Sequence, residues 1–105
     1  MADSMDIAEW RRQIDEIDRK LVELLNQRAR MAQQIGRLKR HTRMPIREPE
    51  RERTILENVR RASRGPLPPE ELAGIFERMI AAMRKLQKDE MLAEQPAEHC
   101  ARRRE

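Results

Sequence analysis

The chain of 105 residues contains very few aromatic residues, cysteines and glycines. Trp10 and Phe76 are its only aromatic residues, so the chain offers little for stacking the bases of nucleic acids. A single cysteine, Cys100, excludes both a disulfide framework and a cluster of thiolate metal ligands, and it favours a reducing compartment. No apolar run approaches the length of about 18 residues that a membrane span needs. We therefore expect a soluble, cytoplasmic protein.

Charged residues, in contrast, make up 40% of the chain. The 23 basic and 19 acidic residues leave a net charge of +4, and such a basic excess is typical of proteins that bind nucleic acids. Here the two signs are interleaved along the chain, as on an ordinary solvated surface. Part of the excess comes from the run Arg102–Arg104. A non-catalytic helical dimer that binds nucleic acid or a partner protein is thus an alternative that we do not favour.

Apolar residues recur at alternating steps of three and four between residues 11 and 39. This spacing predicts a long amphipathic helix that packs against other helices. The stripe consists of Ile14, Ile17, Leu21, Leu24, Arg28, Met31, Ile35 and Leu38. Its one charged member, Arg28, is costly to bury without a partner, so we expect either a compensating group or a register-specifying role for it. Because no strand-like alternation occurs, the predicted class is all-α.

The predicted first helix begins near Ile7, with Asp6 as its cap and Glu9 as the capping-box partner. About 33 residues at about 1.5 Å each give a length near 50 Å. A compact domain of this size has a radius of gyration of only about 13 Å. The helix is therefore too long for its own chain to cover, and a homodimer is expected. In an antiparallel dimer, Arg11 of one chain would approach the middle or the end of the partner's helix.

Proline and glycine residues mark the rest of the chain. We expect a loop at residues 41–47, then a short second helix with Glu48 at its cap and Pro49 in its first turn. A third helix is expected from about Pro69 to about Met91. Residues 1–95 would form one helical domain, and residues 96–105 a disordered basic tail.

Each predicted helix carries polar residues on its apolar face. Arg28 and Lys39 share one helical direction to within about 20°, so the two cations are placed to bracket a small anion. Glu48, Arg51 and Glu52 continue the apolar face of the second helix. Gln87 follows the apolar face of the third. Taken singly, each has a structural alternative: Arg51 could pair with a neighbouring glutamate, and Lys39 could be solvated.

A longer combination of residues resembles the all-helical (AroQ-type) chorismate mutases of the shikimate pathway, which serve aromatic amino-acid biosynthesis. The matching positions are Arg11, Ile14, Asp15, Ile17, Asp18, Leu21, Leu24, Leu25 and Arg28, then Ile35, Gly36 and Lys39, and then Pro45, Ile46, Pro49, Arg51 and Glu52. The resemblance covers about residues 7 to 90. It implies an isomerase that rearranges chorismate to prephenate, built as an intertwined dimer of three-helix chains.

The resemblance also implies which residues bind the substrate. Arg28 and, from the partner chain, Arg11 would hold the two carboxylates of chorismate. Lys39 would bind a carboxylate and the ether oxygen, and Gln87 would donate a hydrogen bond to the same ether oxygen. Lys39 and Gln87 are therefore the expected catalytic residues.

The remaining substrate-binding positions are expected on the second and third helices. Glu48 would accept the ring hydroxyl, while Arg51 and Glu52 would line and order the pocket. Met83 departs from the resemblance, because the family commonly has Ser or Thr at this position, near a carboxylate. This substitution puts a minor contact in doubt.

The chemistry fits this set of residues. An intramolecular rearrangement needs no nucleophile, metal or proton shuttle, and we expect no cofactor. It needs a dianion held in its reactive conformer, and donors aimed at the oxygen where charge develops. An isochorismate-pyruvate lyase on the same fold is an alternative, which the acidic residue at position 48 disfavours. Docking onto another shikimate-pathway enzyme is a further expectation that the residues themselves do not decide.

Overall fold

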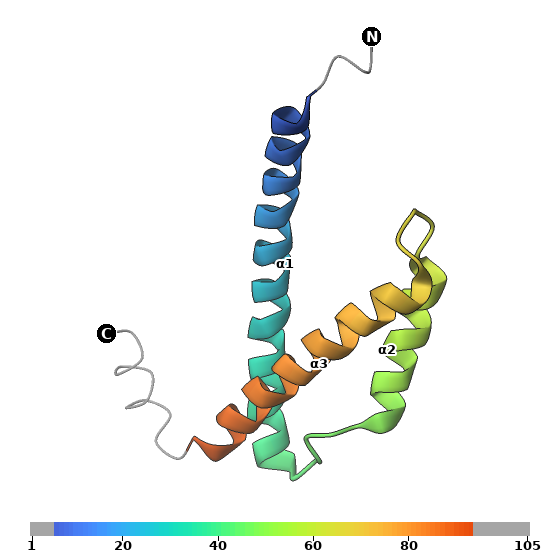
Figure 1. Cartoon of the computed structure of the whole chain (residues 1–105). Helices are drawn as coiled ribbons and strands as arrows, with labels where there is room; N and C mark the ends of the chain where they lie inside the picture. The colour runs from blue at the N-terminus through green and yellow to red at the C-terminus, as the bar shows by residue number, and fades with distance from the viewer. Residues whose placement is uncertain (1–5, 94–105) are drawn as a thin grey trace, which may run out of the picture. The chain divides into compact units, whose positions relative to one another are not determined.

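The computed structural model describes residues 6–93, where all regular secondary structure is α-helical. Three helices follow in chain order: α1 (Ile7–Thr42), α2 (Pro49–Ala62) and α3 (Pro69–Leu92) (Figure 1). The predicted all-α class is confirmed. The tail predicted for residues 96–105 lies outside the described residues. Between residues 6 and 93, no helix is both long and apolar enough to cross a membrane.

The chain divides into two units, and the first comprises residues 1–31. Its described part is the N-terminal segment of α1, which is capped as predicted: the backbone N–H of Glu9 donates to Asp6 Oδ1 at 3.0 Å. The predicted capping box is not completed, because the Glu9 carboxylate pairs with Arg12 instead. The apolar stripe of this segment is exposed, with Ile14, Ile17 and Leu21 at 54%, 55% and 50% of full exposure.

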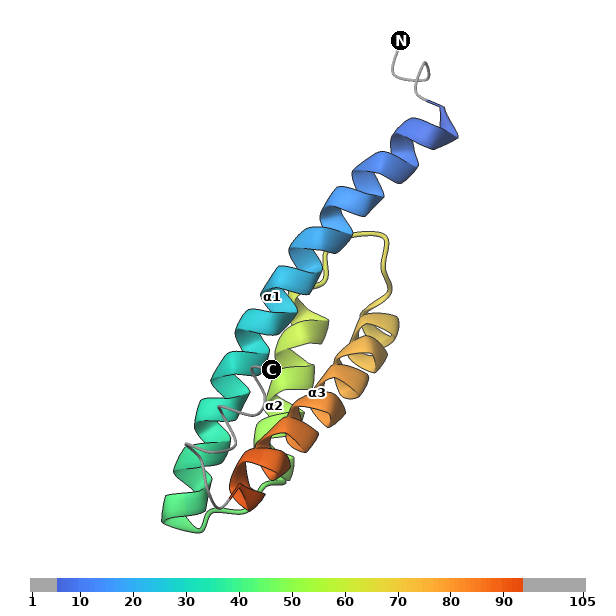
Figure 2. The ribbon, with the colours of Figure 1, turned by 90° about the vertical axis from the view of Figure 1, so that its left-hand side faces the viewer.

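The second unit, residues 32–105, contains the end of α1 together with α2 and α3. α3 runs back beside α2 and then lies against the last turns of α1 (Figure 2). The core of the second unit is small and consists mainly of Ala32, Ala73, Ile80 and Met83. Short aliphatic side chains on α2 are half-buried against it. The core thus lies where three helical segments of the unit meet.

The connection between α1 and α2 differs slightly from the prediction. α1 continues through His41 to Thr42, so the loop begins two residues later than expected. Arg43 follows in the left-handed backbone region with φ of 62°, and its N–H donates to Lys39 O at 2.7 Å. This geometry terminates the helix. α2 then begins as predicted, with Glu48 at the N-cap and Pro49 in the first turn.

Candidate active site

Lys39 is the centre of the polar cluster in the second unit. Its side chain retains only 3% exposure, so the alternative of a solvated lysine is wrong. Three acceptors surround its Nζ: Gln87 Oε1 at 2.8 Å, the backbone oxygen of Ile46 at 2.9 Å and Glu48 Oε2 at 2.8 Å. An ammonium group has three N–H donors, so this set matches its capacity. The carboxylate compensates a charge that would otherwise be costly to bury.

Glu48 reaches Lys39 because of where α2 begins. As the N-cap residue it has a non-helical backbone, with φ of −129° and ψ of 87°, and its side chain makes no capping hydrogen bond to the helix. The carboxylate is therefore directed to Lys39, and it stays partly accessible at 37% exposure. Its position at the positive end of the α2 dipole favours a negative charge.

Gln87 is brought to Lys39 by a close approach of α1 and α3 at Gly36. A Cβ atom on Gly36 would lie 2.9 Å from both Gln87 Cα and Gln87 O, which leaves no room for a side chain. Because lysine can only donate, the amide oxygen of Gln87 must face Nζ. The amide NH₂ group then points away from Lys39. This orientation leaves the NH₂ group of Gln87 to donate to an acceptor other than Lys39.

A second set of contacts, which the sequence did not indicate, ties α3 to α1 one turn further along. The buried carboxylate of Glu90 accepts a hydrogen bond from Arg37 Nε at 3.0 Å. Arg40 Nη1 donates to the backbone oxygen of Glu90 at 2.9 Å and also to that of Ala93. Arg40 therefore adds a donor at the end of α3 to two carbonyl oxygens, of which that of Glu90 also accepts from the Ala93 N–H. Glu90 lies three residues after Gln87 and therefore on the same face of α3. This spacing could have indicated from sequence that Glu90 faces α1.

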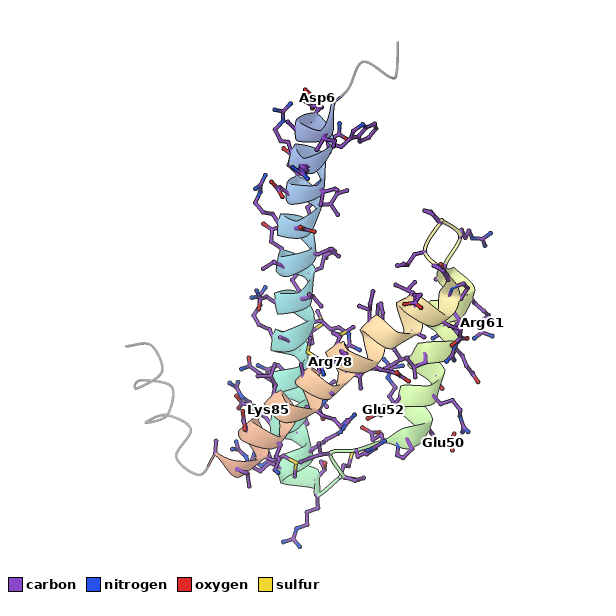
Figure 3. The ribbon with its side chains drawn as sticks, viewed as in Figure 1. Asp6, Glu50, Glu52, Arg61, Arg78 and Lys85 are labelled. Carbon is purple, nitrogen blue, oxygen red and sulfur yellow. The ribbon has the colours of Figure 1, made fainter. Side chains whose placement is uncertain are left out.

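Glu52 and Arg84 form a further link between α2 and α3. Arg84 Nε lies 3.0 Å from Glu52 Oε2, as an ion pair without hydrogen-bond alignment. Figure 3 places Glu52 on the side of α2 that faces α3, and Glu50 farther from α3. Both members of the pair line a cavity of about 500 Å³ between the two helices. Arginines supply much of the cavity wall, whose apolar part includes Leu56 and Ile80.

The other predicted site residues occupy different environments. Arg51 is exposed, whereas Met83 is buried in the core of the second unit. Arg11 and Arg28 belong to the first unit, where Arg11 is exposed and Arg28 is half-buried. The structure thus brings Lys39, Glu48 and Gln87 together, with Glu52 one turn after Glu48. The assignment of Arg11, Arg28, Arg51 and Met83 to the same site stays a prediction.

This arrangement can bind and polarise, but it has no obvious nucleophile. It combines a buried cation, an oriented amide donor and a partly accessible carboxylate. Such groups suit electrostatic stabilisation of an oxygen on which negative charge develops. Within residues 6–93, no group of three or more His, Cys, Asp or Glu side chains could hold a metal ion.

Comparison with known proteins identifies the family. The family model for chorismate mutase type II matches residues 10–88. The chain belongs to this family. A chorismate mutase (Form II) of Thermus thermophilus has the same fold, with a TM-score of 0.76 at 30% identity over 78% of this chain and 93% of that chain. A chorismate mutase of Helicobacter pylori, solved in complex with prephenate, gives a TM-score of 0.76 at 28% identity over 85% of this chain and 97% of that chain.

Curated relatives fall into two kinds. A bifunctional chorismate mutase/prephenate dehydratase of Aquifex aeolicus is 39% identical over 79% of this chain. The present chain spans about a quarter of the length of the bifunctional relatives, 24% of the Aquifex protein. A chorismate mutase of Methanocaldococcus jannaschii is 34% identical over 78% of this chain and 84% of its own length.

Proposed function

We propose that this chain catalyses the rearrangement of chorismate to prephenate. The observation that carries the proposal is the Lys39 cluster, in which a buried ammonium group fixes the amide of Gln87 next to Glu48. Family membership and the prephenate complex of the Helicobacter pylori relative support the choice of substrate. Aromatic amino-acid biosynthesis is the corresponding pathway.

In the proposed mechanism, the protein restrains the substrate and stabilises developing charge. Chorismate is a dianion, and its rearrangement breaks one C–O bond while one C–C bond forms within the same molecule. Arg28 and Lys39 would hold the compact conformer by its carboxylates, which removes most of the orientational entropy of the reaction. On substrate binding, the Lys39 ammonium would exchange one of its three present acceptors for the ether oxygen. It and the Gln87 amide would then donate to this oxygen as negative charge builds on it. Glu48 would accept the ring hydroxyl.

A homodimer would complete the site. The exposed stripe that includes Ile14, Ile17 and Leu21 is an apolar helix face that a second long helix can cover. Arg11 lies 17 residues before Arg28, about 25 Å away along a helix at about 1.5 Å per residue. Both cannot bind one small ligand within a chain, so Arg11 would serve the site of the partner subunit. The two sites of the dimer would then be shared between the chains.

The decisive experiment follows the loss of chorismate absorbance with wild-type protein and with Lys39→Ala. Removal of the central donor should lower kcat by about 10²–10³-fold, the size of effect that a lost oxyanion donor has elsewhere. Since the Gln87 amide needs no proton to donate, the wild-type protein should be active at neutral pH. Absence of turnover by the wild type, or an undiminished rate in Lys39→Ala, would contradict the proposal. Release of pyruvate from isochorismate would favour the lyase instead.

The shared site has its own test, in which Arg11→Ala and Arg28→Ala chains are mixed. Each variant alone should be nearly inactive, because every site lacks one arginine. A mixed dimer contains one site with both arginines, so activity should return to about half of the wild-type rate per mixed dimer. No recovery despite demonstrated subunit exchange would place both arginines in the same chain's site. Docking onto another enzyme of the pathway stays a prediction.

A further inference from the structure

The Glu52–Arg84 pair lies one helical turn from the Lys39 cluster, on the same two helices. Glu52 follows Glu48 by four residues on α2, and Arg84 precedes Gln87 by three residues on α3. Residues at these spacings are neighbours on a helix surface. The 3.0 Å contact between Arg84 Nε and Glu52 Oε2 therefore places a carboxylate and its counter-ion beside the proposed substrate site.

This pair is more protected from water than the ion pair formed within α2. The side chains of Glu52 and Arg84 are 18% and 30% exposed, whereas those of Glu50 and Arg53 are 85% and 61% exposed. Charges that are partly shielded from solvent interact more strongly over a given distance. If Arg84 were absent, the carboxylate of Glu52 would lose its ion-pair partner beside the proposed site. The same loss at Arg53 would leave a carboxylate that water screens.

We infer that Arg84 is a positioning residue that neutralises Glu52 and holds its carboxylate, so that the site accepts a dianion. The inference rests on the proposed chorismate mutase function. The family resemblance implies that Glu52 lines and orders the pocket, and both carboxylates of the substrate must approach a region that already contains Glu48 and Glu52. Arg84 offsets one of these two negative charges. It acts through Glu52, and no contact with the substrate is required of it.

The expected kinetic signature distinguishes this role from a structural one. The substrate carries its two carboxylates in the ground state and in the transition state alike. An unpaired Glu52 should therefore repel both states to a similar extent, which raises KM and leaves kcat nearly unchanged. If the pair served only to hold α2 against α3, its loss would instead lower the melting temperature without raising KM at constant kcat.

The test measures prephenate binding by titration calorimetry and chorismate turnover by absorbance in variants of the 105-residue chain. Arg84→Met should raise the Kd for prephenate and the KM for chorismate about tenfold, a typical effect of one nearby charge. Arg84→Lys, which keeps the charge, should bind within about threefold of wild type. In Arg84→Met/Glu52→Gln the uncompensated charge is gone, and most of the lost affinity should return. The matched control is Arg61→Met, at an exposed position of α2 that does not line the cavity, whose Kd should stay within about twofold of wild type.

The outcomes separate this inference from the function on which it rests. Wild-type turnover together with unchanged prephenate binding in Arg84→Met would overturn the role of Arg84 alone. Failure of the double variant to regain affinity would also overturn it, because the effect would not then come from Glu52. A wild-type protein that neither binds prephenate nor consumes chorismate would overturn the proposed function as well. Should Arg84→Met not fold, Arg84→Gln carries the same expectation.

Discussion

The two segments of α1 differ in how their side chains are used. Residues 7–31 expose their apolar stripe, and Arg11 and Arg28 belong to the same segment. Residues 32–42 belong to a unit in which polar side chains cross from helix to helix, as Lys39 does to Gln87 and Arg37 to Glu90. The first segment thus exposes an apolar surface, while in the second segment Arg37, Lys39 and Arg40 already have partners on α3.

This difference shows which part of the proposed site one chain can build. Lys39, Glu48 and Gln87 come together within a single unit of a single chain, because the loop after α1 and the contact at Gly36 place them there. The apolar stripe of residues 7–31 has no such cover in its own unit, and in our proposal a second copy supplies it. The donors would therefore be formed by one chain, and the carboxylate clamp completed by two.

The largest effect should come from a charge placed in the exposed stripe. If Leu21 packs against a partner helix, Leu21→Lys would bury a charge and cost about 3 kcal/mol or more. The protein should then change from a dimer to a monomer of 12.5 kDa, as measured by light scattering after size exclusion. Chorismate turnover should fall at least about a hundredfold, since Arg11 would no longer reach the partner's site.

Asn26→Lys is the matched control for this variant. It adds the same charge to the same segment, at a position about 140° from Leu21 around the helix, on the side away from the stripe. The mass of the particle in solution and the chorismate turnover of this variant should equal those of the wild type. A Leu21→Lys protein that remains dimeric and active would show that the stripe is not the dimer interface.

Gln87→Glu tests the hydrogen-bond donors of the second unit, and its effect on turnover should be slightly smaller. A charged carboxylate cannot donate to the ether oxygen, so kcat at about pH 7.5 should fall about a hundredfold. The neighbouring Lys39 favours the charged form, and the new carboxyl becomes a donor only when protonated, toward or below its ordinary pKa of about 4.3. Activity should therefore rise as the pH is lowered from about 7.5 to about 5. Gln34→Glu, at an exposed position of α1, should show no such profile.

The spacing of apolar residues was sufficient to predict the helices. The start of α1, the positions of Glu48 and Pro49 at the start of α2, and the extent of α3 all follow from capping and proline rules, which act between near neighbours in sequence. The end of α1 was predicted two residues too early, since nothing in His41 and Thr42 forbids a helix. The helix end is set there by Arg43, which adopts a conformation that its residue type rarely adopts.

The partners of the polar groups were harder to predict, because they depend on which helix faces cross. Lys39 and Gln87 could be placed on apolar faces from sequence, but their mutual contact depends on the close approach at Gly36. Arg84 follows Met83 in sequence and resembles an ordinary surface arginine until α2 is placed next to it. Glu90, buried against Arg37, is a similar case.

Gly36→Ala should separate α1 from α3 and thereby disturb the donors. The added Cβ would lie 2.9 Å from the Gln87 backbone, and relief of this overlap should cost about 1–3 kcal/mol. Because Gln87 would shift relative to Lys39, kcat should also fall about tenfold. Gly74→Ala is the matched control: a Cβ there has no atom within 4 Å, so the change should stabilise α3 by about 0.5–1 kcal/mol. Equal effects of the two substitutions in thermal melts would argue against the close approach.

The smallest effect is expected at Arg43, where the chain leaves α1. Its φ of 62° is unfavourable for a residue with a Cβ, and glycine adopts it freely. Arg43→Gly should therefore raise the free energy of unfolding by about 0.5–1 kcal/mol. For a domain of this size, each kcal/mol raises Tm by about 4–8 °C. Arg43→Ala removes the same charge but keeps the Cβ, so the difference between the two melts isolates the backbone term. Turnover should be unchanged in both variants, because the ammonium of Lys39 is held by Glu48, Gln87 and Ile46. A glycine variant that melts below the alanine variant would show that the left-handed turn is not the conformation in solution.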